Sequence, residues 1–256
     1  MTVAISCCVI TLNEADRLEA CLRAASAVAD ELLVVDSGST DGTQEVARRL
    51  GARVLHRDWT GYGQQKRFAE LEARNDWILS LDADEVLSPE LQAEIRALMA
   101  QEPPLAAYRM NIVAVHPGRE RPHWGAEGYN IVRLYDRRRA TYSEHPVHDR
   151  IETGDEPLGQ LDGIVLHFSW RSLEHLRAKM QAYADYQAEV LSKPALALAL
   201  RLPFEYPLTL AKYLFLRRNI FSGWTGIRIS HMTALVRTSR IYKMLNKALG
   251  GRRRVR

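Results

Sequence analysis

The sequence predicts an α/β protein with a mixed, mostly parallel central sheet and a helical C-terminal extension. Over about the first 100 residues, apolar runs typical of buried strands alternate with helical patterns. After Pro104 the strand-like segments become short and follow one another without long helices. From Pro194 onward the composition is helical and basic. We therefore expect an α/β domain over residues 1–192 and a helical extension over residues 193–256.

The first four predicted strands cover residues 3–10, 32–36, 53–55 and 77–82, and the first is a continuous apolar run that fits a strand buried on both faces. Asn13 can cap the helix that follows the first strand, and Gly51 should end the helix after the second. Ser88 followed by Pro89 predicts another helix start. This β-α-β-α order indicates a parallel, doubly wound sheet.

The second half is expected to extend the sheet with antiparallel strands at residues 108–115, 131–135, 147–151 and 164–168. A long helix is predicted over residues 172–191. Residues 194–249 read as helical, interrupted at Pro203, at Pro207 and at the glycines of residues 223–226.

The cysteine content and the distribution of charge indicate the cellular compartment and the kind of binding partner to expect. The three cysteines, Cys7, Cys8 and Cys21, are too few for a disulfide framework and suggest a reducing compartment. The first apolar run lacks the features of a signal peptide, and no run reaches the roughly 18 apolar residues of a spanning helix. Residues 201–256 carry 13 Lys and Arg but one acid, whereas the rest of the chain is acidic. This asymmetry suggests an anionic surface as a partner.

Asp82-Ala83-Asp84 is the central chemical signal. Two carboxylates two residues apart at a strand end point the same way and repel each other unless a cation joins them. Mg²⁺ takes one or two carboxylates together with phosphate oxygens, which suits a nucleoside diphosphate. The alternative is a solvated acidic turn.

Further polar residues end the neighbouring strands. Asp36 ends the second, and residues 11–14 (Thr-Leu-Asn-Glu) end the first, so three polar strand ends should converge on one crevice. Asp36 could accept from a ribose hydroxyl or a uracil N–H, while Ser37 and its neighbouring hydroxyls could equally only shape the turn. The chain lacks G-x-G-x-x-G and G-x-x-x-x-G-K-[ST], which argues against dinucleotide oxidoreductases and P-loop NTPases.

Residues 10–14 (ITLNE), 34–43 (VVDSGSTDGT) and 81–85 (LDADE) together resemble family 2 glycosyltransferases of the GT-A fold, the nucleotide-diphospho-sugar transferase fold. Residues 61–66 (GYGQQK), 133–138 (RLYDRR), 147–149 (VHD) and 166–169 (LHFS) further resemble the lipopolysaccharide-core β-1,4-glucosyltransferase group. The chain departs from that group's usual Trp-Tyr-Pro-Asp at residues 124–129 (WGAEGY), which leaves the acceptor open.

The resemblance implies an inverting, Mg²⁺- or Mn²⁺-dependent hexosyltransferase that uses a UDP-sugar, with UDP-glucose the expected donor. The residues implied in donor binding are Thr11, Asn13, Glu14, Asp36, Ser37, Lys66 and Asp82. The implied metal ligands are Asp84, Asp82 and His167, although His167 could be structural and Lys66 an exposed helical lysine.

An inverting transfer also needs a carboxylate that takes the proton of the acceptor hydroxyl. Asp149 is the first candidate, with Glu144 and then Glu127 in reserve. Asp149 could instead form a salt bridge with Arg150.

The C-terminal extension mixes aromatic and aliphatic residues with cations, which fits an interfacial helix on anionic lipid. Packing on the catalytic domain or in a homo-oligomer is the alternative. We expect a cytoplasmic enzyme, peripheral on the inner face of the membrane, with a lipid-linked glycan acceptor and no nucleic acid. The rival functions are a polyprenyl-phosphate glycosyltransferase and a non-catalytic nucleotide-binding scaffold.

Overall fold

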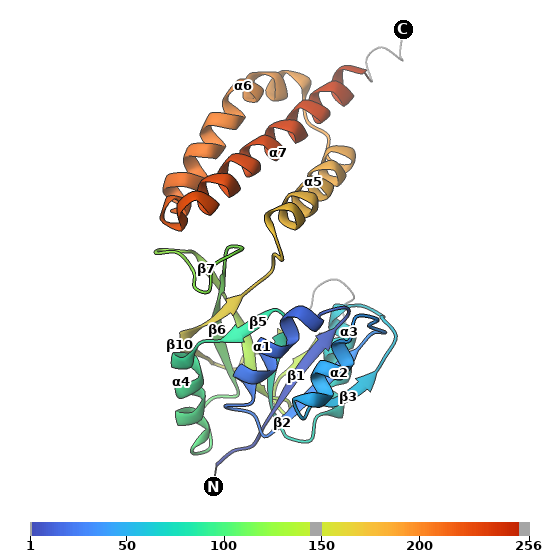
Figure 1. Cartoon of the computed structure of the whole chain (residues 1–256), viewed down its shortest axis with the longest axis vertical. Helices are drawn as coiled ribbons and strands as arrows, with labels where there is room; N and C mark the ends of the chain where they lie inside the picture. The colour runs from blue at the N-terminus through green and yellow to red at the C-terminus, as the bar shows by residue number, and fades with distance from the viewer. Residues whose placement is uncertain (1, 144–149, 251–256) are drawn as a thin grey trace. The chain divides into compact units, whose positions relative to one another are not determined.

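The computed structural model describes residues 2–143 and 150–250. The chain divides into two compact units. Unit 1 comprises Met1–Val113 and Gly128–Phe168, and unit 2 comprises Ala114–Glu127 and Ser169–Arg256. The expected α/β class, with a mixed and mostly parallel sheet and C-terminal helices, is confirmed (Figure 1).

Unit 1 is built on an eight-stranded sheet of order β3-β2-β1-β4-β7-β6-β10-β5. Strands β1 to β4 pair in parallel, and β7 joins β4 antiparallel. Strand β6 pairs antiparallel with β7, and β5 pairs antiparallel with β10. The strands are β1 (Ile5–Thr11), β2 (Glu31–Asp36), β3 (Arg53–His56), β4 (Trp77–Asp82), β5 (Glu85–Leu87), β6 (Ala107–Ala114), β7 (Gly128–Asp136) and β10 (Leu158–His167). A separate small ladder joins β8 (Thr141–Tyr142) to β9 (Ile151–Glu152).

Helices cover both faces of this sheet, as a doubly wound arrangement requires. They are α1 (Ala15–Ala25), α2 (Thr43–Arg49), α3 (Tyr62–Glu72) and α4 (Pro89–Met99). Alternate residues of β1 enter different cores: Cys7 packs with apolar residues of α1, α2 and α4, whereas Cys8 packs with those of α3. The continuous apolar run of this strand therefore reflects burial on both sides.

The parallel register brings the predicted strand ends together. Thr11 lies opposite Asp36, and Ile10 lies opposite Asp82. The carboxyl ends of β1, β2 and β4 thus meet at one edge of the sheet, where open α/β sheets bind ligands.

Two local predictions about helix starts have different outcomes. The Ser88 Oγ accepts from the Leu91 N–H at the start of α4, which confirms the predicted cap. The predicted cap at Asn13 is wrong, because Glu14 is the N-cap residue of α1 and Asn13 has a left-handed backbone with φ 58°.

Unit 2 contains the helices α5 (Leu173–Val190), α6 (Ala195–Ala211) and α7 (Gly223–Gly250), with a π-helical turn η1 (Lys212–Leu216) and a 3₁₀ turn η2 (Asn219–Ser222). Pro203 and Pro207 lie inside α6 and do not interrupt it, whereas Gly223 begins α7 with φ 64°. Helix α5 packs on α7, where Lys243 Nζ lies 2.5 Å from Asp185 Oδ1. Although the sequence suggests a boundary near residue 193, α5 groups in this structure with the helices that follow it.

Candidate active site

Asp36 organises the loop that follows β2. Its side chain is fully buried, and its two oxygens accept from the backbone N–H groups of Gly38 and Ser39, from the hydroxyls of Thr11 and Ser39, and from the amide of Gln44. Burial opposes the carboxylate, but these hydrogen bonds outweigh it, so that the pKa of Asp36 is lowered. Its oxygens are thus engaged within the loop, which favours a role in shaping that loop. Its predicted direct contact with the nucleoside stays a prediction.

Asn13 links the end of β1 to the same loop through hydrogen bonds. Its Oδ1 accepts from the Thr40 N–H at 2.9 Å, and its backbone N–H donates to Ser39 Oγ at 2.8 Å. The neighbouring Glu14 N–H donates to Thr43 Oγ1 at 2.9 Å. The Ser37 Oγ accepts from Gln65 Nε2 at 2.8 Å, which ties the loop to α3. The residues predicted to bind the sugar donor, which lie at and just after the ends of β1 and β2, are therefore joined by hydrogen bonds.

Asp82, at the end of β4, is held between two buried cations. Its Oδ1 lies 2.9 Å from Lys66 Nζ, and its Oδ2 lies 2.9 Å from Arg133 Nη2. The Lys66 side chain is 3% exposed, so Lys66 is not an exposed helical lysine. Arg133 also contacts the fully buried Glu85, whose other oxygen accepts from the Asp82 N–H. Burial opposes the charged form of Asp82, but Lys66 and then Arg133 hold its pKa far below the usual range.

Asp84 faces a second set of partners. Its Oδ2 lies 3.1 Å from Arg17 Nη1, and its Oδ1 lies 3.5 Å from His167 Nε2. Arg17 is also bound by Glu14 and by the carbonyl oxygen of Phe168. Burial works against the imidazolium of His167, but the hydrogen bond and charge of Asp84 outweigh it, so that the pKa of His167 is raised. The structure thus brings the predicted pair Asp84 and His167 together.

The two carboxylates of Asp82-Ala83-Asp84 are therefore compensated by protein cations, and differently. Asp82 has both oxygens engaged by Lys66 and Arg133, whereas Asp84 keeps one oxygen next to an imidazole nitrogen. The expected repulsion between the carboxylates is relieved by these side chains.

The spacing of the donor atoms at Asp84 fits a small divalent cation once the His167 imidazole has lost its proton, because only the neutral ring can be a metal ligand. Two neighbouring ligands of an octahedral ion at about 2.1 Å stand roughly 3 Å apart, close to the 3.5 Å between Asp84 Oδ1 and His167 Nε2. Among the described residues, no group of three or more His, Cys, Asp and Glu side chains is arranged to hold a metal. Asp84 and His167 would hold such an ion.

The predicted bases cannot be placed in this geometry. Asp149 and Glu144 lie outside the described residues. Glu127 belongs to unit 2, where its carboxylate is ion-paired with Arg217.

Sequence reasoning missed Arg133 and Arg17 as members of the site. Arg133 appeared there only as part of a family motif, and Arg17 carried no signal beyond its place on a helix after β1. The pairing of β7 beside β4 is what brings Arg133 to Asp82.

A mixed sheet whose parallel strands end in this charged cluster is the arrangement expected of a GT-A-type nucleotide-sugar transferase domain. Residues 6–154 match the family Glycosyl transferase family 2, and the chain belongs to that family. It is 35% identical to an uncharacterized glycosyltransferase of Rickettsia bellii, over 97% of this chain and 88% of the relative.

Two further proteins are similar over nearly the whole chain. One is the lipopolysaccharide core biosynthesis glycosyltransferase LpsC of Rhizobium meliloti, 26% identical over 93% of this chain and 92% of the relative. The other is the solved mannosyltransferase PcManGT of Pyrobaculum calidifontis, in complex with GDP-Man and Mn²⁺. It aligns with a TM-score of 0.52 and 16% identity over 93% of this chain and 88% of its own, which supports the GT-A fold.

Proposed function

We propose that this glycosyltransferase moves glucose from UDP-glucose, with inversion and with Mg²⁺ or Mn²⁺, to a lipopolysaccharide-core or related lipid-linked glycan. The observation that carries the proposal is the pair Asp84 and His167 beside the Lys66–Asp82–Arg133 cluster at the carboxyl end of β4. The likeness to LpsC supports the lipopolysaccharide acceptor, and the Mn²⁺ complex of PcManGT supports a divalent cation.

The chemistry divides among the residues of this edge. The cation, when bound, would stabilise the departing diphosphate. Lys66 and Arg133 fix the Asp82 carboxylate, which would orient the donor ribose or sugar through hydrogen bonds. Asn13, Thr40 and the Asp36 loop would hold the uridine. Asp149, or Glu144 in its place, would accept the proton of the attacking acceptor hydroxyl.

The donor and the metal can be tested together by thermal unfolding of the full chain. We expect UDP with Mn²⁺ to raise the melting temperature more than GDP, CDP or ADP with Mn²⁺, because binding to the folded state adds RT ln(1+[L]/Kd), about 2.7 kcal/mol at a hundredfold excess over Kd. EDTA should remove the shift and abolish transfer from UDP-glucose. Full activity in EDTA would contradict the metal assignment, and a larger shift with another nucleotide would contradict the uridine assignment. A chain that binds UDP but transfers no sugar would support the scaffold alternative.

The base can be tested by Asp149→Asn. This change removes the proton acceptor and keeps the side-chain shape, so kcat should fall by about 10²-fold or more, the usual range for a lost general base. The affinity for UDP should stay unchanged. Glu144→Gln is the matched comparison, because an inactive Glu144→Gln with an active Asp149→Asn would transfer the role to Glu144.

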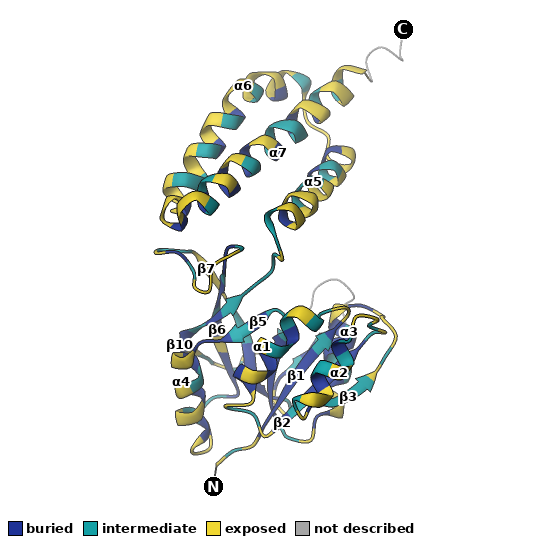
Figure 2. Cartoon of the chain, in the orientation of Figure 1, coloured by how far each residue is buried: buried dark blue, intermediate teal, exposed yellow. Residues whose placement is uncertain are grey.

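The same proposal places the enzyme on the inner face of the cytoplasmic membrane, and the surface of unit 2 supports this. In the described part of the chain, no helix is long and apolar enough to cross a bilayer. Much of helix α6 is exposed (Figure 2). Four of its large apolar side chains follow one another at four-residue spacing and are each at least 60% exposed: Leu196, Leu200, Phe204 and Leu208. Phe215, Leu216 and Trp224 are also exposed, and Lys212, Arg217 and Arg218 lie close to them in the sequence. Apolar rings among cations suit the surface of an anionic bilayer.

Membrane contact can be tested by sedimentation with vesicles. The full chain should sediment with phosphatidylglycerol vesicles, hardly at all with phosphatidylcholine vesicles, and should be released at 1 M salt, where the Debye length is about 3 Å. The double variant Leu200→Glu/Phe204→Glu should lose most of this binding. Leu71→Glu, at an equally exposed leucine of unit 1, is the control and should bind as the wild type does. The membrane proposal would be contradicted if the wild-type chain did not bind anionic vesicles and instead formed oligomers through this face.

A further inference from the structure

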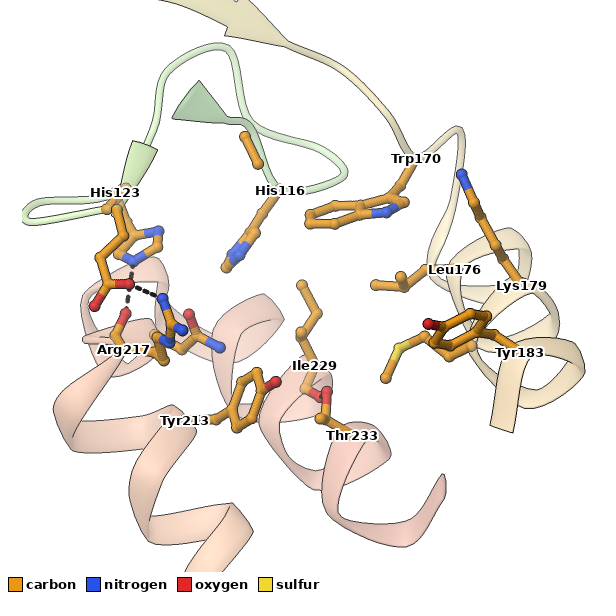
Figure 3. Close-up of a pocket in the computed structure, with 15 residues that line it drawn as sticks. His116, His123, Trp170, Leu176, Lys179, Tyr183, Tyr213, Arg217, Ile229 and Thr233 are labelled. Carbon is orange, nitrogen blue, oxygen red and sulfur yellow. Dashed lines mark hydrogen bonds and ion pairs between the residues drawn. The ribbon is translucent and has the colours of Figure 1, made fainter. Parts of the chain in front are cut away.

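Unit 2 contains a cavity of about 510 Å³ that the proposed transfer does not use. Residues from the loop 114–127, from the segment before α5, and from α5, η1, η2 and α7 line it (Figure 3). Most of the lining is apolar or aromatic: Ala114, Ala126, Trp170, Leu176, Met180, Tyr183, Tyr213 and Ile229. The size and the lining are those of a binding site for a small organic molecule with a large apolar part.

Two histidines give the cavity a polar corner. The rings of His116 and His123 stack with centroids 4.9 Å apart. His116 Nδ1 lies 2.9 Å from Ser222 Oγ, and burial, followed by the charges of His123 and Arg119, lowers the pKa of His116 to about 4. Its imidazole is therefore neutral at physiological pH, which keeps this corner compatible with apolar contacts.

His123 carries an unused hydrogen-bonding atom. Its Nε2 donates to the carbonyl oxygen of Arg217 at 3.2 Å, which leaves Nδ1 as the ring nitrogen that can meet a ligand. The residue is 8% exposed, and Nδ1 has no hydrogen-bond partner among the described protein atoms. Buried polar atoms without a partner are rare, and a hydroxyl or acid proton of a ligand in this cavity would supply one. In Figure 3, Nδ1 lies on the side of the ring that faces His116.

Cations and the exposed apolar surface lie next to this cavity. Lys179 and Arg217 line it, and Arg217 is ion-paired with Glu127. The turn η1 contributes Tyr213 to the lining, while its residues Phe215 and Leu216 are more than 60% exposed. The turn that lines the cavity therefore also belongs to the surface proposed to meet the bilayer.

We propose that this cavity binds one hydrocarbon chain of an anionic amphiphile, with that chain against Trp170, Leu176 and Ile229 and with the protonated phosphate or hydroxyl head near His123 and Arg217. The inference rests on the proposed membrane-associated transfer. The amphiphile has two natural sources, a chain of the lipid-linked acceptor or a bulk phospholipid. Either source would tether unit 2 to the membrane lipid by a buried chain in addition to surface contact.

The first test is calorimetric titration of the full chain with decyl phosphate below its micelle concentration. We expect one molecule bound per chain and no binding of inorganic phosphate at the same concentration. Ala126→Phe should fill the cavity and weaken binding at least tenfold. Ala182→Phe, an exposed alanine of α5 outside the lining, is the matched control and should bind as the wild type does.

A second measurement does not depend on the folding of Ala126→Phe. Decyl phosphate brominated on its chain should quench tryptophan fluorescence, and Trp170→Phe should remove most of that quenching. The absence of decyl phosphate binding, or equal binding and quenching in both cavity variants and the wild type, would overturn the proposal.

Steady-state kinetics with UDP-glucose can show whether the bound hydrocarbon chain belongs to the acceptor or to a bulk phospholipid. If the chain belongs to the acceptor, Ala126→Phe should raise KM for lipopolysaccharide and not for its delipidated core oligosaccharide. If it belongs to bulk phospholipid, Ala126→Phe should weaken binding to phosphatidylglycerol vesicles and leave both KM values unchanged. Binding of decyl phosphate without any turnover of a nucleotide sugar would contradict the proposed function and leave the lipid site standing.

Discussion

Replacing Asp84 by Asn is expected to reduce sugar transfer at least 10³-fold while leaving the fold intact. The amide keeps the size of the side chain but removes the negative oxygen beside His167 that would hold the cation. A 10³-fold loss corresponds to about 4 kcal/mol, which is within the several kcal/mol that a metal ion contributes to stabilising a departing phosphate. The initial rate with saturating UDP-glucose, measured across a Mn²⁺ titration, gives the result directly.

The fold should survive this change because the partners of Asp84 have other contacts. Arg17 retains Glu14 and the carbonyl oxygen of Phe168, and the Asp84 side chain is partly exposed. The melting temperature of Asp84→Asn should therefore lie close to that of the wild type. Asp58→Asn, at an exposed aspartate of the same unit, is the control and should keep full activity. If Asp84→Asn retained more than a tenth of the wild-type rate, Asp84 would not be the metal ligand.

The sequence was sufficient to predict the four parallel strands and the edge at which their polar ends meet, but it missed β5 and placed in the main sheet a strand at residues 147–151, where the structure has β9 in the separate ladder with β8. The apolar runs of β1, β2 and β4 end in polar residues, and the parallel register aligns those ends. These features can be read from short stretches of sequence, because the apolar run of a buried strand and the periodic apolar face of a helix each appear within a window of a few residues.

The charge partners at that edge could not be predicted in the same way. Arg133 reaches Asp82 across 51 positions, and Arg17 reaches Asp84 across 67. Such pairs depend on which strand lies beside β4 and on how α1 packs, and neither follows from the spacing of residues along the chain. Asn13 shows the same limit on a smaller scale. As a candidate cap it resembles many others, but the Asp36 loop supplies Ser39 and Thr40 as partners, and the helix begins two residues later.

Asp82 is expected to behave differently from Asp84, although the two stand two residues apart. Asp82→Asn removes the carboxylate that lies 2.9 Å from the Nζ of buried Lys66 and 2.9 Å from Arg133 Nη2. Removing one partner of a fully buried ion pair costs about 3–5 kcal/mol, but the Asp82 side chain is 35% exposed, so we expect a smaller loss of about 1–3 kcal/mol, which arises because the Lys66 ammonium stays buried. Arg133 retains Glu85, and Lys66 loses the carboxylate oxygen that lies 2.9 Å from its Nζ. We expect Asp82→Asn to lower the urea concentration at the midpoint of unfolding of unit 1. Asp84→Asn is the matched control and should change this midpoint little.

A double-variant cycle separates this explanation from a general loss of packing. Lys66→Met replaces the buried ammonium by an apolar side chain of similar length, so Asp82→Asn/Lys66→Met should regain much of the stability that Asp82→Asn loses. The coupling free energy between the two positions should then be well above the few tenths of a kcal/mol found for independent sites. Activity should not return in the double variant, because the fixed carboxylate that would orient the donor is still absent. Additive stability effects, or a destabilisation as small as that of Asp84→Asn, would show that Asp82 is not the structural centre of this edge. In that case the two aspartates would share one role, and the assignment of Asp82 to structure and Asp84 to metal binding would be wrong.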